Sequence, residues 1–194
     1  MRRALASFLL ASYLCLPHAA TGCTAITGKE SKADVLRYLQ RNRIHLEKDC
    51  VWKAVTADLG KGDLDFARAF IALLDYSTQE AAGPRRLVIT NQQVTYPALS
   101  GLMLVGKAAQ PLVLEALTGA DSSDESRKNA AIVVFLLNRN DVIEGARRIA
   151  AAYWNVADQA TAKKVLDAAI HATRSCGPEL QALCQAEIFK RPVP

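Results

Sequence analysis

The stretch PALSGLMLVGKAAQPLVLEALTGADSSDESRKNAAIVVFLL, residues 97–137, decides the fold of this chain. It divides into three short segments with apolar residues at helical spacing, separated by Gly106 and by the polar residues 119–125. Their apolar stripes carry almost no charge, so each expected helix must bury most of its surface against neighbouring helices. The pattern therefore predicts an all-α protein in which helices stack in an array.

Local signals set the ends of the three central helices. Gly106 suits the C-cap of the first helix. Pro111 suits the first turn of the second helix, because its missing N–H has no partner there in any case. Ser122 and Glu125 have the spacing of a capping box and are expected to begin the third helix, which runs to Leu137.

The flanking sequence supplies more helices of the same kind. Ser31 and Asp34 form a capping-box pattern at the start of a helix that extends to about residue 42. Asp63 is expected to cap a helix whose apolar stripe includes Leu64, Phe70 and Leu74. Further helices are expected over 49–59, 141–154, 158–174 and 177–189. The chain from 31 to 190 is therefore predicted to form one helical domain.

One segment breaks the regularity of the array. Residues 77–86 are polar, and 87–96 contain two β-branched runs around Asn91. This composition predicts either a small β-hairpin or an extended connector. Insertions between repeats often carry binding function, so 87–96 is the irregular segment of most functional interest.

The helices recur as blocks of helix, short turn and helix, at 51–76, 97–118 and 127–153. The middle block, ALSGLMLVGKAAQPLV, resembles a HEAT repeat, with an apolar helix, a glycine turn and a second helix that begins at a proline. RKNAA, at 127–131, resembles the start of the next unit. The resemblance implies an α-α superhelix, a short array of antiparallel helix pairs. It also implies a non-catalytic scaffold that binds other proteins.

The first 22 residues have the three parts of a secretory signal peptide. Arg2 and Arg3 are followed by an apolar run over 4–16, and small residues precede Cys23. The run is too short to cross a bilayer comfortably. We therefore expect export to the periplasm, the outer membrane or the extracellular medium, with 23–30 acting as a tether.

Cys23 has two interpretations. The sequence Ala20-Thr21-Gly22-Cys23 resembles the lipobox of bacterial lipoproteins, which implies that Cys23 becomes a lipidated first residue. The alternative is ordinary cleavage near Gly22, which leaves Cys23 free to form a disulfide. If Cys23 is lipidated, we expect the protein to contact the membrane only through this N-terminal lipid anchor.

The other cysteines also leave alternatives. Cys50, Cys176 and Cys184 remain with Cys23 after removal of the signal, and an oxidising compartment favours disulfides. Cys176 and Cys184 flank the turn at Gly177 and could join two helices. Cys50 is the alternative partner of either residue.

Charge and motif content argue against several function classes. Without Arg2 and Arg3, the 24 basic residues become 22 against 19 acidic ones, a net charge of about +3, and the basic residues are scattered. Nucleic-acid binding is not expected, because it needs a basic face. The sequence contains no catalytic, metal-binding or cofactor-binding motif, and His45 and His171 are isolated.

These observations predict a non-enzymatic scaffold that binds another envelope or secreted protein. The alternative is an enzyme or small-ligand carrier whose site lies in the concave groove of the array. Its polar candidates are Tyr96, Glu115 and His171.

Overall fold

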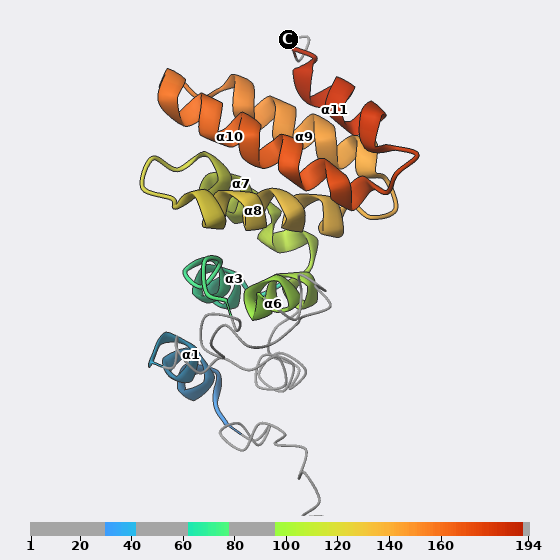
Figure 1. Cartoon of the computed structure of the whole chain (residues 1–194). Coiled ribbons are helices and arrows are strands. Elements are labelled where there is room, and N and C mark those ends of the chain that lie inside the picture. The colour runs from blue at the N-terminus through green and yellow to red at the C-terminus, as the bar shows by residue number, and fades with distance from the viewer. Residues whose placement is uncertain (1–29, 42–61, 78–95, 192–194) are drawn as a thin grey trace, which may run out of the picture.

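The computed structural model describes residues 30–41, 62–77 and 96–191, and all regular secondary structure in these ranges is helical (Figure 1). The all-α prediction is confirmed for this part of the chain. The helices are α1 (Lys32–Arg41), α3 (Leu64–Ile71), α6 (Pro97–Val105), α7 (Gln110–Thr118), α8 (Asp124–Leu137), α9 (Val142–Trp154), α10 (Gln159–Ala172) and α11 (Gln181–Phe189). Two short 3-10 turns, η2 (Lys107–Ala109) and η3 (Thr173–Cys176), lie between them.

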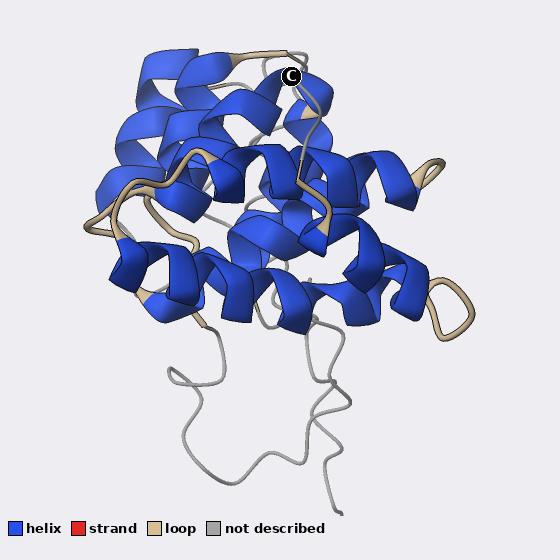
Figure 2. Cartoon of the chain, turned by 90° about the horizontal axis from the view of Figure 1, so that it is seen from above, coloured by secondary structure: helices blue, strands red, loops and turns tan. Residues whose placement is uncertain are grey.

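The helices are stacked in layers along the molecule. In Figure 1, α1 lies at one end, followed by α3 with α6, then α7 with α8, then α9 with α10, and α11 lies at the other end. Figure 2 shows the same stack of helices from above, with the connecting loops in tan. The superhelical, HEAT-like arrangement stays a prediction.

Closest packing does not follow the blocks seen in the sequence. The helices of the middle block, α6 and α7, meet at a bend of 106° rather than reversing direction. The main partner of α6 is α3, and that of α7 is α8. Gly106 allows this change of direction, because its φ of 83° lies in the left-handed region that favours glycine.

The central stretch forms the core, as its low charge predicts. Helix α6 buries seven of its nine residues. Helix α8 buries an unbroken run from Asn129 to Phe135, so it is surrounded on all sides by other helices. Around it pack α7, α9 and α10.

Helix α6 approaches α3 so closely that one position has no room for a side chain. A Cβ added to Gly101 would lie 2.6 Å from ring atoms of Phe70, a distance at which something must move. Phe70 is itself fully buried. Gly101 is thus required by the packing of these two helices.

Replacing Gly101 with alanine is expected to lower the free energy of unfolding by about 2 kcal/mol, because overpacking a tight core costs about 1–3 kcal/mol. Thermal or urea unfolding followed by circular dichroism measures this loss. The double variant Gly101→Ala, Phe70→Leu removes the clashing ring and should lose less than the two single variants lose in sum. Purely additive losses would contradict the close approach.

The predicted caps at Asp63 and Asp141 are confirmed. Asp63 accepts hydrogen bonds from the backbone N–H groups of Asp65 and Phe66, and Asp141 accepts one from Glu144. At the first helix, the Ser31 hydroxyl accepts from the backbone of Asp34 at 3.3 Å. These local patterns set helix starts without help from tertiary structure.

The predicted capping box at Ser122 and Glu125 is wrong by one residue. Helix α8 begins at Asp124, and its N-cap is Ser123, which accepts from the backbone N–H of Ser126 at 3.1 Å. Ser122 instead donates its hydroxyl to the carbonyl oxygen of Ala116 at 2.6 Å. It is therefore occupied in closing the end of α7.

Three expectations about other helices need correction. Helix α10 ends at Ala172 rather than 174, and continues as η3. Helix α11 begins at Gln181 rather than 177, because Gly177 has a φ of 83° and cannot continue a helix. Leu64 was expected in the core, but it is 42 % exposed at the first position of α3.

Several predictions lie outside the described residues. They concern the signal peptide, the tether, the helix over 49–59 and the irregular segment as far as residue 95. They also concern Cys23, His45 and Cys50. Within the described ranges, no single helix is long and apolar enough to cross a membrane. Helices α6 and α7 together, with the 3-10 turn η2, have the required length and composition, but they are bent by 106°.

Candidate functional site

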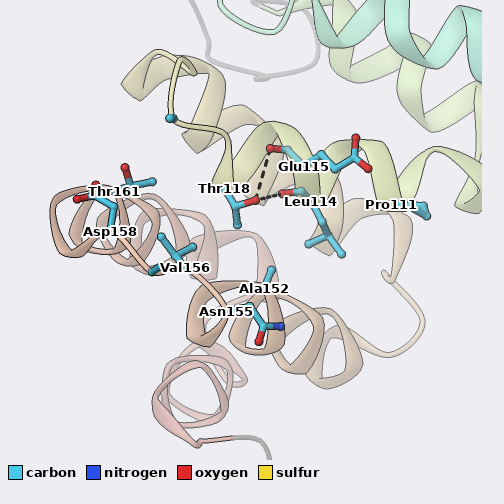
Figure 3. A pocket seen from close by; sticks show the side chains of 11 residues that line it. Pro111, Leu114, Glu115, Thr118, Ala152, Asn155, Val156, Asp158 and Thr161 are labelled. Atoms are coloured by element: carbon cyan, nitrogen blue, oxygen red, sulfur yellow. Dashed lines mark hydrogen bonds between the residues drawn. The ribbon is translucent and has the colours of Figure 1, made fainter.

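An open groove of about 430 Å³ lies between α7 and the junction of α9 with α10 (Figure 3). Its lining residues are mostly small, apolar or acidic. They are Pro111, Leu114, Glu115, Thr118, Ala120, Ala152, Asn155, Val156, Ala157, Asp158 and Thr161. Residues from two parts of the chain, far apart in sequence, therefore form its two walls.

One wall is a single face of α7. Pro111, Leu114, Glu115 and Thr118 follow the i, i+3, i+4, i+7 spacing that places side chains on one stripe of a helix. The opposite stripe, with Val113 and Leu117, is buried in the core. In a closed helix bundle another helix would cover the stripe with Pro111, Leu114, Glu115 and Thr118, but here this stripe stays accessible.

The other wall is the turn between α9 and the first turn of α10. Asn155 ends α9 and donates its amide to the carbonyl oxygen of Ala151 at 2.9 Å. Asp158 caps α10 by accepting from the backbone N–H of Thr161 at 2.6 Å. Hydrogen bonds from the hydroxyl and the backbone of Thr161 hold the pKa of Asp158 below its usual value, so it is ionised at neutral pH.

The groove is acidic. Glu115 and Asp158 are its ionisable lining residues, and none of the lining residues is basic. In the described part of the chain neither carboxylate forms an ion pair. Figure 3 shows Glu115 on α7 and Asp158 on the opposite wall.

A buried arginine holds the end of the first wall in place. Arg127 is 1 % exposed, and its guanidinium donates from Nη1 to the carbonyl oxygen of Leu117 at 2.9 Å and from Nη2 to that of Ala120 at 3.2 Å. These carbonyls belong to the end of α7 and the loop that follows it. Arg127 thus fixes the path of the backbone around Thr118 and Ala120 in the wall.

The three polar candidates from the sequence do not share a site. Glu115 lies in the groove, but Tyr96 and His171 do not line it. Tyr96 instead donates its hydroxyl to the carboxylate of Glu125. His171 is half-buried, and burial lowers its pKa, helped by the charges of Arg174 and Lys128, so the imidazole is neutral at pH 7.

Glu125 links α8 to the residue that precedes α6. Burial raises its pKa, but the hydrogen bonds from Tyr96 and Lys128 together outweigh that effect, so its pKa lies below the usual value. A depressed carboxyl pKa stabilises the fold above the unfolded-state pKa, and this stability is lost as pH falls through the folded-state pKa.

Tyr96→Phe should therefore lower stability at pH 7, by no more than about 1 kcal/mol, because Glu125 is partly solvated. The difference from the natural protein should shrink as the pH falls below the ordinary glutamate pKa. Urea unfolding at pH 7 and at pH 3 measures it. A difference of the same size at both pH values would show that the ionised carboxylate is not the partner that matters.

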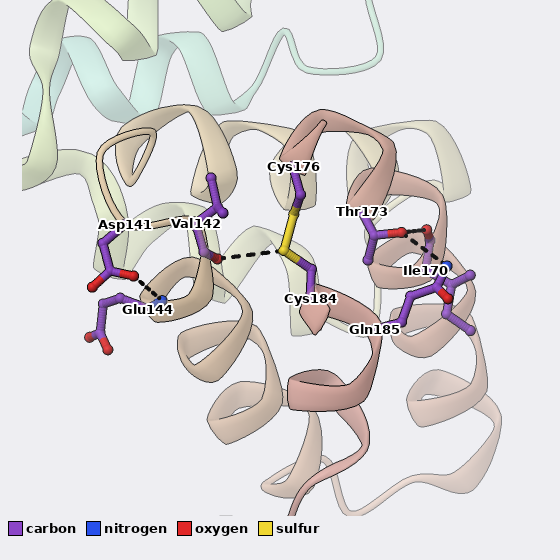
Figure 4. Close-up of a disulfide and its surroundings, with 8 residues drawn as sticks. All are labelled: Asp141, Val142, Glu144, Ile170, Thr173, Cys176, Cys184 and Gln185. Atoms are coloured by element: carbon purple, nitrogen blue, oxygen red, sulfur yellow. Dashed lines mark hydrogen bonds between the residues drawn. A yellow bond between two sulfur atoms is a disulfide. The ribbon is translucent and has the colours of Figure 1, made fainter. Parts of the chain in front are cut away.

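The sulfur atoms of Cys176 and Cys184 lie 2.24 Å apart, at disulfide distance (Figure 4). This is the pair expected to join two helices. Cys184 is fully buried on α11, and its Sγ lies 4.0 Å from the carbonyl oxygen of Val142 at the start of α9. The bond therefore connects the end of η3 with α11, beside α9.

The described ranges contain no group of three or more His, Cys, Asp or Glu residues that could hold a metal ion. Sequence reasoning placed Glu115 among its candidates but missed Asn155, Asp158 and Thr161 as wall residues. The only available signal for them was the capping role of Asp158.

Comparisons with protein-family models, with curated proteins and with solved structures find no match.

Proposed function

We propose that this chain is an exported, non-catalytic helical scaffold that binds another protein of the cell envelope through the groove between α7 and α10. The groove carries this proposal. It is an accessible surface with an ordered wall on each side, and its lining combines apolar contact area with hydrogen-bonding groups. Such a surface suits a segment of a partner protein.

Two features support an exported location. The first 22 residues have the composition of a signal peptide. The cysteines at 176 and 184 lie at disulfide distance, which is compatible with an oxidising compartment. Lipidation of Cys23 would hold the scaffold at a membrane, and cleavage without lipidation would leave it free.

The shape and chemistry of the groove favour a protein partner over a small substrate. Small-molecule sites are usually enclosed, with a few polar groups that converge on one point. Here the groove is open, and Glu115 and Asp158 stand on separate walls. Of the three polar candidates for an enzymatic site, only Glu115 lines the groove, whereas Tyr96 and His171 lie outside it.

Site-specific photo-crosslinking in the cells that produce the protein tests this function. A photoreactive residue at Thr118, inside the groove, should give a discrete protein adduct that mass spectrometry maps to one segment of one partner. The same residue at Lys163, exposed on α10 and outside the lining, is the control and should give no such adduct. Absence of an adduct at Thr118, or equal adducts at both positions, would refute binding through the groove.

A further inference from the structure

We infer that the groove selects an extended, positively charged segment of its partner, with lysine or arginine side chains that pair separately with Glu115 on one wall and with Asp158 on the other. This inference rests on the proposed function and adds the chemistry of the ligand. It follows from the charge of the groove, from the direction of its hydrogen bonds and from the size of its wall residues.

The charge of the groove favours a cation. Glu115 and Asp158 stand on separate walls, with the Glu115 carboxylate pointing away from Asp158 in Figure 3, and no basic side chain among the lining residues neutralises either of them. Both carboxylates lie outside the ion pairs of the described chain. An acidic partner would be repelled by both walls, and a basic one attracted.

Hydrogen-bond direction gives an independent argument. Part of the donors in the groove is used within the protein: the Thr118 hydroxyl donates to the carbonyl of Leu114 at 3.0 Å, and Asn155 uses one of its two N–H groups on the carbonyl of Ala151. The backbone N–H of Thr161 donates to Asp158 at 2.6 Å. The groove therefore presents mainly acceptors to its ligand, namely two carboxylates, the Asn155 carbonyl and hydroxyl lone pairs.

Lysine and arginine match such a surface, because they carry several donors and no acceptor. Neutral amides and hydroxyls would leave part of their own acceptors unpaired. A carboxylate or phosphate, which brings acceptors only, would find few donors among these side chains, one being the second N–H of Asn155, and would be repelled by the two carboxylates. Charge and hydrogen-bond direction thus point to the same class of ligand.

The remaining lining suits the rest of such a segment. Ala120, Ala152 and Ala157 leave room for a backbone to approach, and Pro111, Leu114 and Val156 offer apolar contact. The aliphatic stem of lysine or arginine packs on apolar surface of this kind while its charged end stays with the carboxylates.

Binding is tested by titrating the exported, isotopically labelled protein with three peptides and following its backbone amide resonances. The peptides are acetyl-Gly-Val-Lys-Ala-Lys-Gly-amide and its versions with glutamate or with norleucine in place of both lysines. The lysine peptide should shift the amides of Glu115, Asn155 and Asp158, and the glutamate peptide should not. Binding of the lysine peptide should weaken as salt is added.

Variants that remove one negative charge test whether each carboxylate takes part in binding. Glu115→Gln and Asp158→Asn should each weaken binding of the lysine peptide about threefold, the effect of one exposed ion pair. Asparagine caps helices as well as aspartate, so Asp158→Asn keeps the start of α10. The matched controls are Glu179→Gln and Asp167→Asn, at exposed positions outside the groove, which should leave affinity unchanged.

The inference fails if the norleucine peptide binds with the same affinity as the lysine peptide. It fails too if the two groove variants bind the lysine peptide with the same affinity as the control variants. It also fails if the segment crosslinked at Thr118 carries no basic residue. In each of these cases an adduct at Thr118 still supports the proposed function. Absence of that adduct, by contrast, would refute the proposed function itself.

Discussion

Replacing Arg127 with alanine is expected to lower the free energy of unfolding by about 3–4 kcal/mol. The guanidinium is buried and donates to two backbone carbonyls, those of Leu117 and Ala120. Hydrogen bonds from a charged donor contribute about 1.5–3 kcal/mol each, and truncation also leaves a cavity. Relief of the buried charge offsets part of this loss, because the described residues contain no carboxylate paired with Arg127.

Two further variants separate the causes of this loss in urea unfolding. Arg127→Met keeps most of the volume but has no donor, so it should still lose about 2 kcal/mol through the unpaired carbonyls. Arg174→Ala, which truncates an exposed arginine, should change stability by less than about 0.5 kcal/mol. A methionine variant as stable as the natural protein would show that the two hydrogen bonds contribute nothing net.

Removing the disulfide between Cys176 and Cys184 should lower stability by about 2–3 kcal/mol. The bond closes a loop with a sequence separation of eight. Chain-entropy arguments give a stabilisation of that size for a loop this short. Without the bond, α11 is held to α9 and η3 only by packing and side-chain contacts such as Gln185 to Thr173 at 3.2 Å.

The double variant Cys176→Ala, Cys184→Ala tests this expectation. Alanine is preferred to serine, because a serine hydroxyl at the fully buried position 184 would add its own desolvation cost. Hydrogen exchange should become faster throughout α11 and remain unchanged in α6, which is far along the stack. Unaltered exchange in α11 would mean that the helix is held by packing alone.

Much of the fold could be predicted because its signals are local. Pro97, Gly106 and Pro111 mark the ends of α6 and α7, and Asp63 and Asp141 cap their helices as expected. The error at Ser122 shows the limit of such reasoning. Two adjacent serines fit the same capping pattern, and the choice depends on which of them the end of α7 occupies.

The groove could not be predicted in the same way. Its walls are brought together by the packing of α8 against both α7 and α10. This packing has no local signature in the sequence. Glu115 and Asp158 are separated by two helices in sequence, so only the tertiary arrangement shows that they face one groove.

The most direct test of the account is the yield of the partner adduct at position 118 when the lysine peptide competes for the groove. We predict that the lysine peptide lowers the yield and that the glutamate peptide leaves it unchanged. A yield that neither peptide alters, or that both lower equally, would contradict the claim that this acidic groove is the surface by which the protein recognises its partner.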